Sequence, residues 1–170
     1  ILRLSSTAQD QSMLNHKKIV IIGGTTGIGL SAAQAFVGAG AHVVVVGRNP
    51  ASAQAAQAQL GDAAQVYIGD ASDPSTAENA ITLCLETFGH FDGLYHVAGG
   101  SGRKYGDGPL HELTLEGWNK TFEINLTGLM LSNQAAVRHF KALGKGGSIL
   151  NMSSVLGFSP SPKYFVTHAY

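Results

Sequence analysis

The sequence has few features of a secreted, membrane-bound or nucleic-acid-binding protein. Cys84 is its single cysteine, so no disulfide can form within the chain, which suits a reducing compartment. No apolar run is long enough to cross a bilayer, and the N-terminus lacks the apolar core of a signal peptide. Basic and acidic side chains number 11 each, so no net charge attracts nucleic acid or an anionic membrane. We therefore expect a cytoplasmic protein that binds neither.

Metal-ligand spacing is also missing from the sequence. His96, His111, His139 and His168 are scattered, and we predict no metal site. Cys84 falls inside an expected helix, which favours a core position over a nucleophile. The 170 residues suffice for one domain with a hydrophobic core. Because the sequence begins without Met, we expect it to be part of a longer gene product.

Glycine, by contrast, is abundant, with 22 residues, and one cluster follows the first apolar run. Residues 18–22 are mostly β-branched, which predicts a buried parallel strand. Gly23, Gly27 and Gly29 then lead into a helix expected over 30–38. Glycines between such a strand and a helix allow the backbone and the helix N-terminus to approach a phosphate. The stretch favours a nucleotide site; the alternative is a tight turn without a ligand.

Strands and helices are predicted to alternate along the rest of the chain. Further strands are expected over 42–46, 66–68, 94–97 and 148–152, and further helices over 50–60, 74–88 and 114–143. This alternation implies parallel strands joined by right-handed crossovers, hence an α/β fold with a doubly wound, Rossmann-like sheet and helices on both faces. We expect residues 1–16 to form an N-terminal arm, and residues 17–170 to form one domain that is incomplete at its C-terminus.

In such folds, ligands bind beyond the carboxyl ends of the strands. That edge would bring together residues 23–29, 47–48, 70, 98–100 and 153–154. One site can therefore use all of these segments.

Together these motifs resemble the short-chain dehydrogenase/reductase family of the single-domain type, from about residue 18 to the end of the sequence. The pattern Gly23-x-x-x-Gly27-x-Gly29 is similar to the glycine motif of the family. Ala98-Gly99 is similar to the end of its Asn-Asn-Ala-Gly element, but His96 and Val97 replace the two asparagines, which leaves the support of the fourth strand open.

Three residues resemble the family's catalytic set. Asn125 matches a mid-helix Asn that continues a proton relay through water; alternatively it bonds to a nearby carbonyl and bends the helix. Ser154 matches the Ser that holds the substrate oxygen, or else it caps a turn. Tyr170, with Tyr164 as its rival, matches the Tyr that exchanges a proton with that oxygen. The family's Lys would follow Tyr170 by four residues, so the 170-residue polypeptide alone is expected to bind cofactor poorly and to catalyse little.

Arg48 follows the second strand, where an acidic residue would bind the adenine-ribose hydroxyls of NAD. An Arg can pair with the 2′-phosphate of NADP, so we expect NADP to be preferred over NAD, unless Arg48 is merely a solvated loop residue. Asp70 resembles the acidic residue that meets the adenine in the family, or it is a turn residue. The cofactor site implied by the resemblance consists of Gly23, Thr25, Thr26, Gly27, Ile28, Gly29, Arg48, Asp70, Ala71, Ala98 and Gly99.

The resemblance implies an oxidoreductase that transfers a hydride between NADP(H) and a small carbonyl compound or secondary alcohol. The alternative is a catalytically silent nucleotide-binding or scaffold protein, because a fold alone does not determine function. Arg103, Lys104 and Tyr105 line the substrate site or face solvent. Family members commonly pair through the helical region that corresponds to residues 115–143, so we expect a homodimer or homotetramer.

Overall fold

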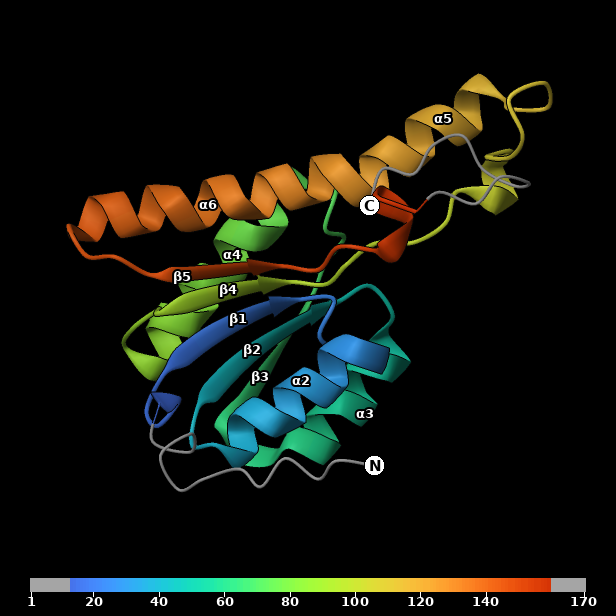
Figure 1. Cartoon of the computed structure of the whole chain (residues 1–170). Coiled ribbons are helices and arrows are strands. Elements are labelled where there is room, and N and C mark those ends of the chain that lie inside the picture. The colour runs from blue at the N-terminus through green and yellow to red at the C-terminus, as the bar shows by residue number, and fades with distance from the viewer. Residues whose placement is uncertain (1–12, 160–170) are drawn as a thin grey trace.

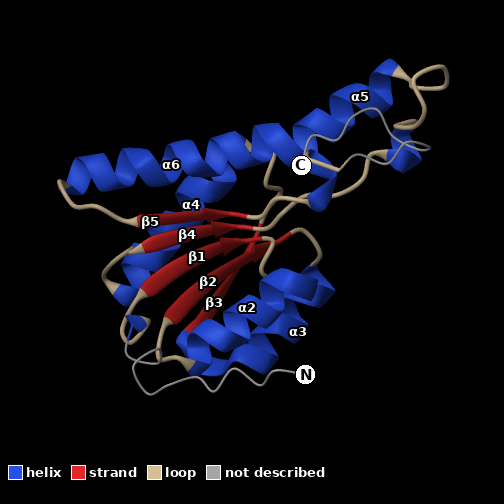
Figure 2. Ribbon diagram, viewed as in Figure 1, coloured by secondary structure: helices blue, strands red, loops and turns tan. Residues whose placement is uncertain are grey.

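The protein, described over residues 13–159 by a computed structural model, contains a five-stranded parallel sheet (Figures 1 and 2). The strand order is β3-β2-β1-β4-β5. Its strands are β1 (Lys18–Ile22), β2 (His42–Gly47), β3 (Ala64–Ile68), β4 (Gly93–His96) and β5 (Ser148–Asn151). The chain moves outward from β1 to β3 and then returns to the other side of β1 with β4. The order therefore reverses between β1 and β4, which confirms the predicted doubly wound sheet.

Helices cover both faces of the sheet. α2 (Gly27–Gly38) and α3 (Pro50–Leu60) lie on one face, and α4 (Pro74–Phe88) and α6 (Gly128–Leu143) lie on the other (Figure 2). α5 (Leu115–Phe122) extends beyond the edge where the strands end (Figure 1). Among the described residues, none of these helices has the length and apolar character that a bilayer span requires.

The β-branched runs are explained by this two-sided cover. In β2, Val43 and Val45 pack on the side of α2, whereas Val44 and Val46 pack on the side of α4 and α6. All four side chains are buried. A strand that is buried on both faces needs apolar residues at every position, so its sequence does not alternate between apolar and polar residues.

Three predicted helix starts are confirmed by their caps. The side chains of Asn49 and Asp73 accept hydrogen bonds from backbone N–H groups in the first turns of α3 and α4, and Thr114 does the same for α5. The start predicted for the first helix was wrong, because α2 begins at Gly27 rather than at residue 30. Gly29 in its first turn is required by packing, because a Cβ there would lie 2.1 Å from the carbonyl oxygen of Gly23.

The single helix predicted over 114–143 is in fact two helices separated by a π-helical turn, η3 (Glu123–Thr127). Asn125 lies in the middle of this wider turn. Its Nδ2 donates to the Thr121 carbonyl one turn back, at 3.0 Å. The local bond that the sequence left open as an alternative is therefore present, and the regular helix is interrupted where it forms.

The end of the predicted N-terminal arm contacts the domain. The His16 N–H donates to the Gly40 carbonyl at 2.9 Å, and Leu14 packs beside the α2 face of the sheet. Residues 1–12 and 160–170, which include the predicted Tyr170 and its rival Tyr164, lie outside the described residues.

Candidate functional site

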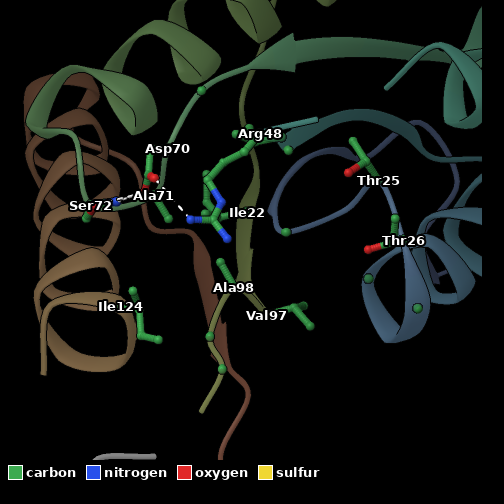
Figure 3. Close-up of a pocket in the computed structure, with 18 of the residues that line it drawn as sticks. Ile22, Thr25, Thr26, Arg48, Asp70, Ala71, Ser72, Val97, Ala98 and Ile124 are labelled. Carbon is green, nitrogen blue, oxygen red and sulfur yellow. Dashed lines mark hydrogen bonds and ion pairs between the residues drawn. The ribbon is translucent and has the colours of Figure 1, made fainter. Parts of the chain in front are cut away.

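A cleft of about 530 Å³ lies at the carboxyl ends of β1, β2, β3 and β4 (Figure 3). This is the edge at which the sequence predicts a ligand site. Every residue predicted to bind a cofactor lines the cleft: Gly23, Thr25, Thr26, Gly27, Ile28, Gly29, Arg48, Asp70, Ala71, Ala98 and Gly99. Ser72 and Ile124 also line it, and the sequence analysis missed both because they follow no motif.

The three glycines of the loop after β1 serve different purposes. Gly23 has a φ of +90°, and a Cβ on it would lie 2.7 Å from the backbone nitrogen of Ala98. Gly29 allows α2 to approach the loop, as described above. Gly27 has a φ of +52° and would meet nothing within 4 Å, so its backbone faces open space in the cleft. Packing thus explains two of the glycines, and the third leaves the backbone accessible to a ligand.

The N-terminus of α2 points its unpaired backbone donors into this cleft. Its N-cap residue, Thr26, makes no side-chain capping bond, and the first turn contains no acidic residue. α3, α4 and α5 are all capped by side chains, as described above. An uncapped N-terminus leaves N–H groups and the positive end of the helix dipole to an anion. This end of the cleft therefore fits a phosphate or pyrophosphate group.

Arg48 and Asp70 face each other across the mouth of the cleft (Figure 3). The Arg48 Nη1 lies 3.3 Å from the Asp70 Oδ2. The other oxygen of Asp70 accepts hydrogen bonds from the Ser72 N–H at 2.9 Å and its hydroxyl at 2.8 Å. Burial tends to raise the pKa of Asp70, but the Ser72 bonds and the Arg48 charge outweigh it and hold that pKa below its ordinary value. Asp70 is thus a turn residue and a cleft residue together.

A second cleft of about 210 Å³ lies beside the first, and the two share the wall formed by residues 97–100. Asn125, Leu129 and residues 152–154 complete it. Asn125 holds the wall with its amide, since its Oδ1 accepts from the Gly100 N–H at 2.9 Å and its Nδ2 donates to the Gly100 carbonyl at 2.8 Å. A sequence motif alone does not predict this contact.

Ser154 lies in the second cleft and also begins a short 3-10 helix, η4 (Val155–Gly157). Its Oγ accepts a hydrogen bond from the Leu156 N–H at 3.2 Å. This bond uses a lone pair of the oxygen, so the hydroxyl proton can still be donated to a ligand. The turn-capping role and a ligand-binding role are therefore compatible.

His96 is a site-forming residue that the sequence analysis missed. Its side chain is 1% exposed and lies below the shared wall. The Nδ1 is 2.7 Å from the Ser132 Oγ on α6, and the Nε2 is 3.0 Å from the Ala98 carbonyl oxygen. The sign of this role in the sequence is that His96 stands where the family has an Asn.

Of the remaining candidates, two line the first cleft and Cys84 lies in the core. Lys104 and Tyr105, in the 3-10 helix η2 (Arg103–Tyr105), line the first cleft, and the ammonium of Lys104 lies 4.9 Å from the ring centre of Tyr105. Cys84 is buried and donates to the His90 carbonyl. The described residues contain no group of three side chains that could hold a metal ion.

Comparisons with known proteins agree with this geometry. The model of the short chain dehydrogenase family matches residues 17–169. The chain is 33% identical over 151 residues to an NADP-dependent (R)-specific alcohol dehydrogenase of Lentilactobacillus kefiri, covering 88% of this chain and 58% of that enzyme. It is also 33% identical over 144 residues to a sorbitol dehydrogenase of Cereibacter sphaeroides, covering 85% of this chain and 55% of the relative.

Solved structures show the same likeness. A 3-ketoacyl-(acyl-carrier-protein) reductase from Brucella melitensis, complexed with NADH, superposes with a TM-score of 0.78 at 28% identity, covering 88% of this chain and 62% of the other. A short chain dehydrogenase from Bacillus anthracis gives a TM-score of 0.80 at 26% identity, covering 89% and 60%. The chain spans little more than half the length of these relatives, and within that span it belongs to the short-chain dehydrogenase family.

Proposed function

We propose that the protein is an NADP(H)-preferring oxidoreductase that acts on a small carbonyl compound or secondary alcohol. The observation that carries the proposal is the wall of residues 97–100 shared by the two clefts. A dinucleotide in the first cleft and a substrate in the second would meet at this wall. The nicotinamide ring, when bound, supplies or accepts the hydride.

The first cleft offers separate groups for the separate parts of a dinucleotide. The backbone around Gly27 and the uncapped N-terminus of α2 suit the pyrophosphate. Arg48 follows β2 and suits a 2′-phosphate, which it can bind with two parallel hydrogen bonds. An acidic side chain in the place of Arg48 would repel that phosphate. These features favour NADP over NAD, and the NADP-dependent alcohol dehydrogenase among the relatives is consistent with this preference.

The chemical roles fall to Ser154 and Asn125, which line the second cleft, and to Tyr170. Ser154 would donate its hydroxyl proton to the substrate oxygen, and Asn125 would keep the wall in place and support a water-mediated proton relay. Tyr170 would exchange the proton with the substrate oxygen. Because an unperturbed Tyr has a pKa near 10, this role requires a nearby cation.

A catalytically silent nucleotide-binding protein is the second candidate. Such a protein would use the first cleft alone. The polar groups that line the second cleft argue against this candidate. A turnover assay with NADPH and a panel of simple ketones and aldehydes distinguishes the two, because a silent protein binds NADPH without oxidising it.

The proposal is tested with the full-length protein by two substitutions, the first of which has a matched control. Arg48→Asp should reverse the preference from NADPH to NADH, whereas Arg138→Asp, at an exposed arginine of α6, should leave it unchanged. Tyr170→Phe should lower kcat by about two to four orders of magnitude, the usual contribution of a positioned acid–base group, with NADPH affinity nearly unchanged. Equal affinities of the unsubstituted protein for NADPH and NADH would refute the NADP preference, and an unchanged kcat in Tyr170→Phe would refute the catalytic role.

We also propose that the protein forms a homodimer or homotetramer through α5 and α6. Leu126, Met130 and Val137 are 41%, 49% and 45% exposed along this helical region, although they are apolar. Apolar side chains that are exposed along one helical region are typical of a protein–protein interface.

A further inference from the structure

The wall between the two clefts is held by two side chains from different elements. Asn125 binds both backbone groups of Gly100, at one end of the wall. His96 reaches the Ala98 carbonyl, near the other end. The N–H groups of Val97 and Ala98 both donate to the Ile22 carbonyl, at 2.8 and 2.9 Å. The position of this short segment is therefore fixed by a small number of identifiable bonds.

The partners of His96 determine which of its nitrogens carries the proton. A backbone carbonyl can only accept, so the Nε2 must be protonated to bind Ala98. In the neutral ring the Nδ1 is then an acceptor, so the single Ser132 hydroxyl proton is shared between the Nδ1 at 2.7 Å and the Leu129 carbonyl at 3.0 Å. Burial lowers the pKa of His96, partly offset by the bond to Ala98, and this favours the neutral ring. The imidazole thus spans from α6 to the wall with one defined orientation.

The Ala98 peptide is a sensitive point of the cofactor cleft. It lines both clefts, and its nitrogen lies where a Cβ on Gly23 would collide. A movement of this peptide would therefore change the width of the first cleft beside the glycine loop and the depth of the second cleft together.

We propose that His96 is a positioning residue that fixes the wall between the clefts by donating a hydrogen bond from Nε2 to the Ala98 carbonyl. The inference rests on the proposed function, because it assumes a dinucleotide in the first cleft. It assigns His96 a role in ligand binding, which differs from simply filling space in the core.

The two nitrogens of the ring can be tested separately. In His96→Gln, the side-chain amide can place a donor near the position of Nε2 and keep the bond to Ala98. In His96→Asn, the shorter amide can keep the contact with Ser132 but cannot reach Ala98. Ser132→Ala is the complementary control, since it removes the Nδ1 partner and leaves the Nε2 bond intact.

The experiment measures NADPH and NADH affinities by fluorescence titration of the full-length protein, together with the thermal midpoint of unfolding without ligand. We expect His96→Asn to weaken both dinucleotides by about 3- to 10-fold, the usual loss for one neutral hydrogen bond. The ratio of the two affinities should not change, because Arg48 is not affected. His96→Gln and Ser132→Ala should stay within about twofold of the unsubstituted protein even where their thermal midpoints fall.

Three results would overturn the inference. Affinity losses that follow the losses of thermal stability across all three variants would show that His96 only fills the core, and unchanged affinity in His96→Asn would do the same. If His96→Asn does not fold, a large affinity loss in His96→Gln or Ser132→Ala, both of which retain the donor to Ala98, would also overturn it. An unsubstituted protein that binds neither dinucleotide would instead overturn the proposed function on which the inference depends.

Discussion

Replacing Asp70 with Asn should increase the preference of the protein for NADPH. The substitution keeps the Oδ1 that accepts both Ser72 bonds, so the turn after β3 is retained. It replaces the Oδ2 that faces Arg48 with an NH2 group, which cannot accept a hydrogen bond from the guanidinium. Arg48 would then not have to give up its ion pair with the Asp70 carboxylate in order to bind a 2′-phosphate.

The size of this effect follows from the exposure of the ion pair. The Arg48 and Asp70 side chains are 66% and 43% exposed, and exposed pairs contribute about 0.2 to 1 kcal/mol. That free energy corresponds to a rise of roughly 1.4- to 5-fold in the ratio of NADPH to NADH affinity. NADH is the internal reference, because it lacks the 2′-phosphate but shares any contact between Asp70 and the adenine.

Calorimetric titrations of both dinucleotides at low and high salt would measure this ratio. The gain should shrink at high salt, because exposed charges are screened. Glu78→Gln is the matched control, since Glu78 pairs with Arg138 at a similar distance and exposure away from the cleft. A ratio that falls, or a gain that persists when Arg48 is also replaced by Ala, would refute the reasoning.

Three further predictions concern the rest of the fold. The pKa of His96 lies below 6.5 in the folded protein, so the unfolded chain takes up the proton first as the pH falls, and the stability present above pH 6.5 should then be lost. Urea unfolding at pH 7 and pH 5 should therefore show a smaller loss of stability in His96→Gln than in the unsubstituted protein. Burial raises the pKa of the Cys84 thiol to about 12, so a thiol reagent at pH 8 should modify it only after unfolding, and rapid modification of the folded protein would contradict its core position. Met130→Glu should convert the proposed oligomer to monomers in light scattering, and an unsubstituted protein that is already monomeric would contradict the proposed interface.

The sequence predicts the sheet and the main cleft well because both depend on strong local signals. The β-branched runs identify the strands, and Asn49, Asp73 and Thr114 mark helix starts through caps that act within three residues. Once the strands are parallel, their carboxyl ends must meet, so the cleft residues converge without further information.

The parts that sequence reasoning missed depend on contacts between distant residues. His96 meets Ser132, 36 positions away, and Arg48 meets Asp70, 22 positions away. No local pattern encodes either pairing. The extra residue of the π-helical turn was not predicted either, although the sequence left open that Asn125 bonds to a nearby carbonyl and bends the helix. The bond between Asn125 and Gly100 becomes visible only in three dimensions.

The π-helical turn has a consequence for the phase of the long helical segment. Buried residues recur at Gly117, Thr121, Asn125, Gly128, Ser132 and Ala136. A regular α-helix advances 100° per residue, so it would rotate Ala136 about 100° away from the side on which Gly117 lies. The wider turn contains one residue more than an α-helical turn, and this keeps the buried residues on one side from α5 to α6. Deleting a single residue within 123–127 would therefore reduce the separation of Gly117 and Ala136 from 19 to 18 residues, which at 100° per residue is five full turns, so a regular α-helix would replace the wider turn without rotating α6 against the sheet.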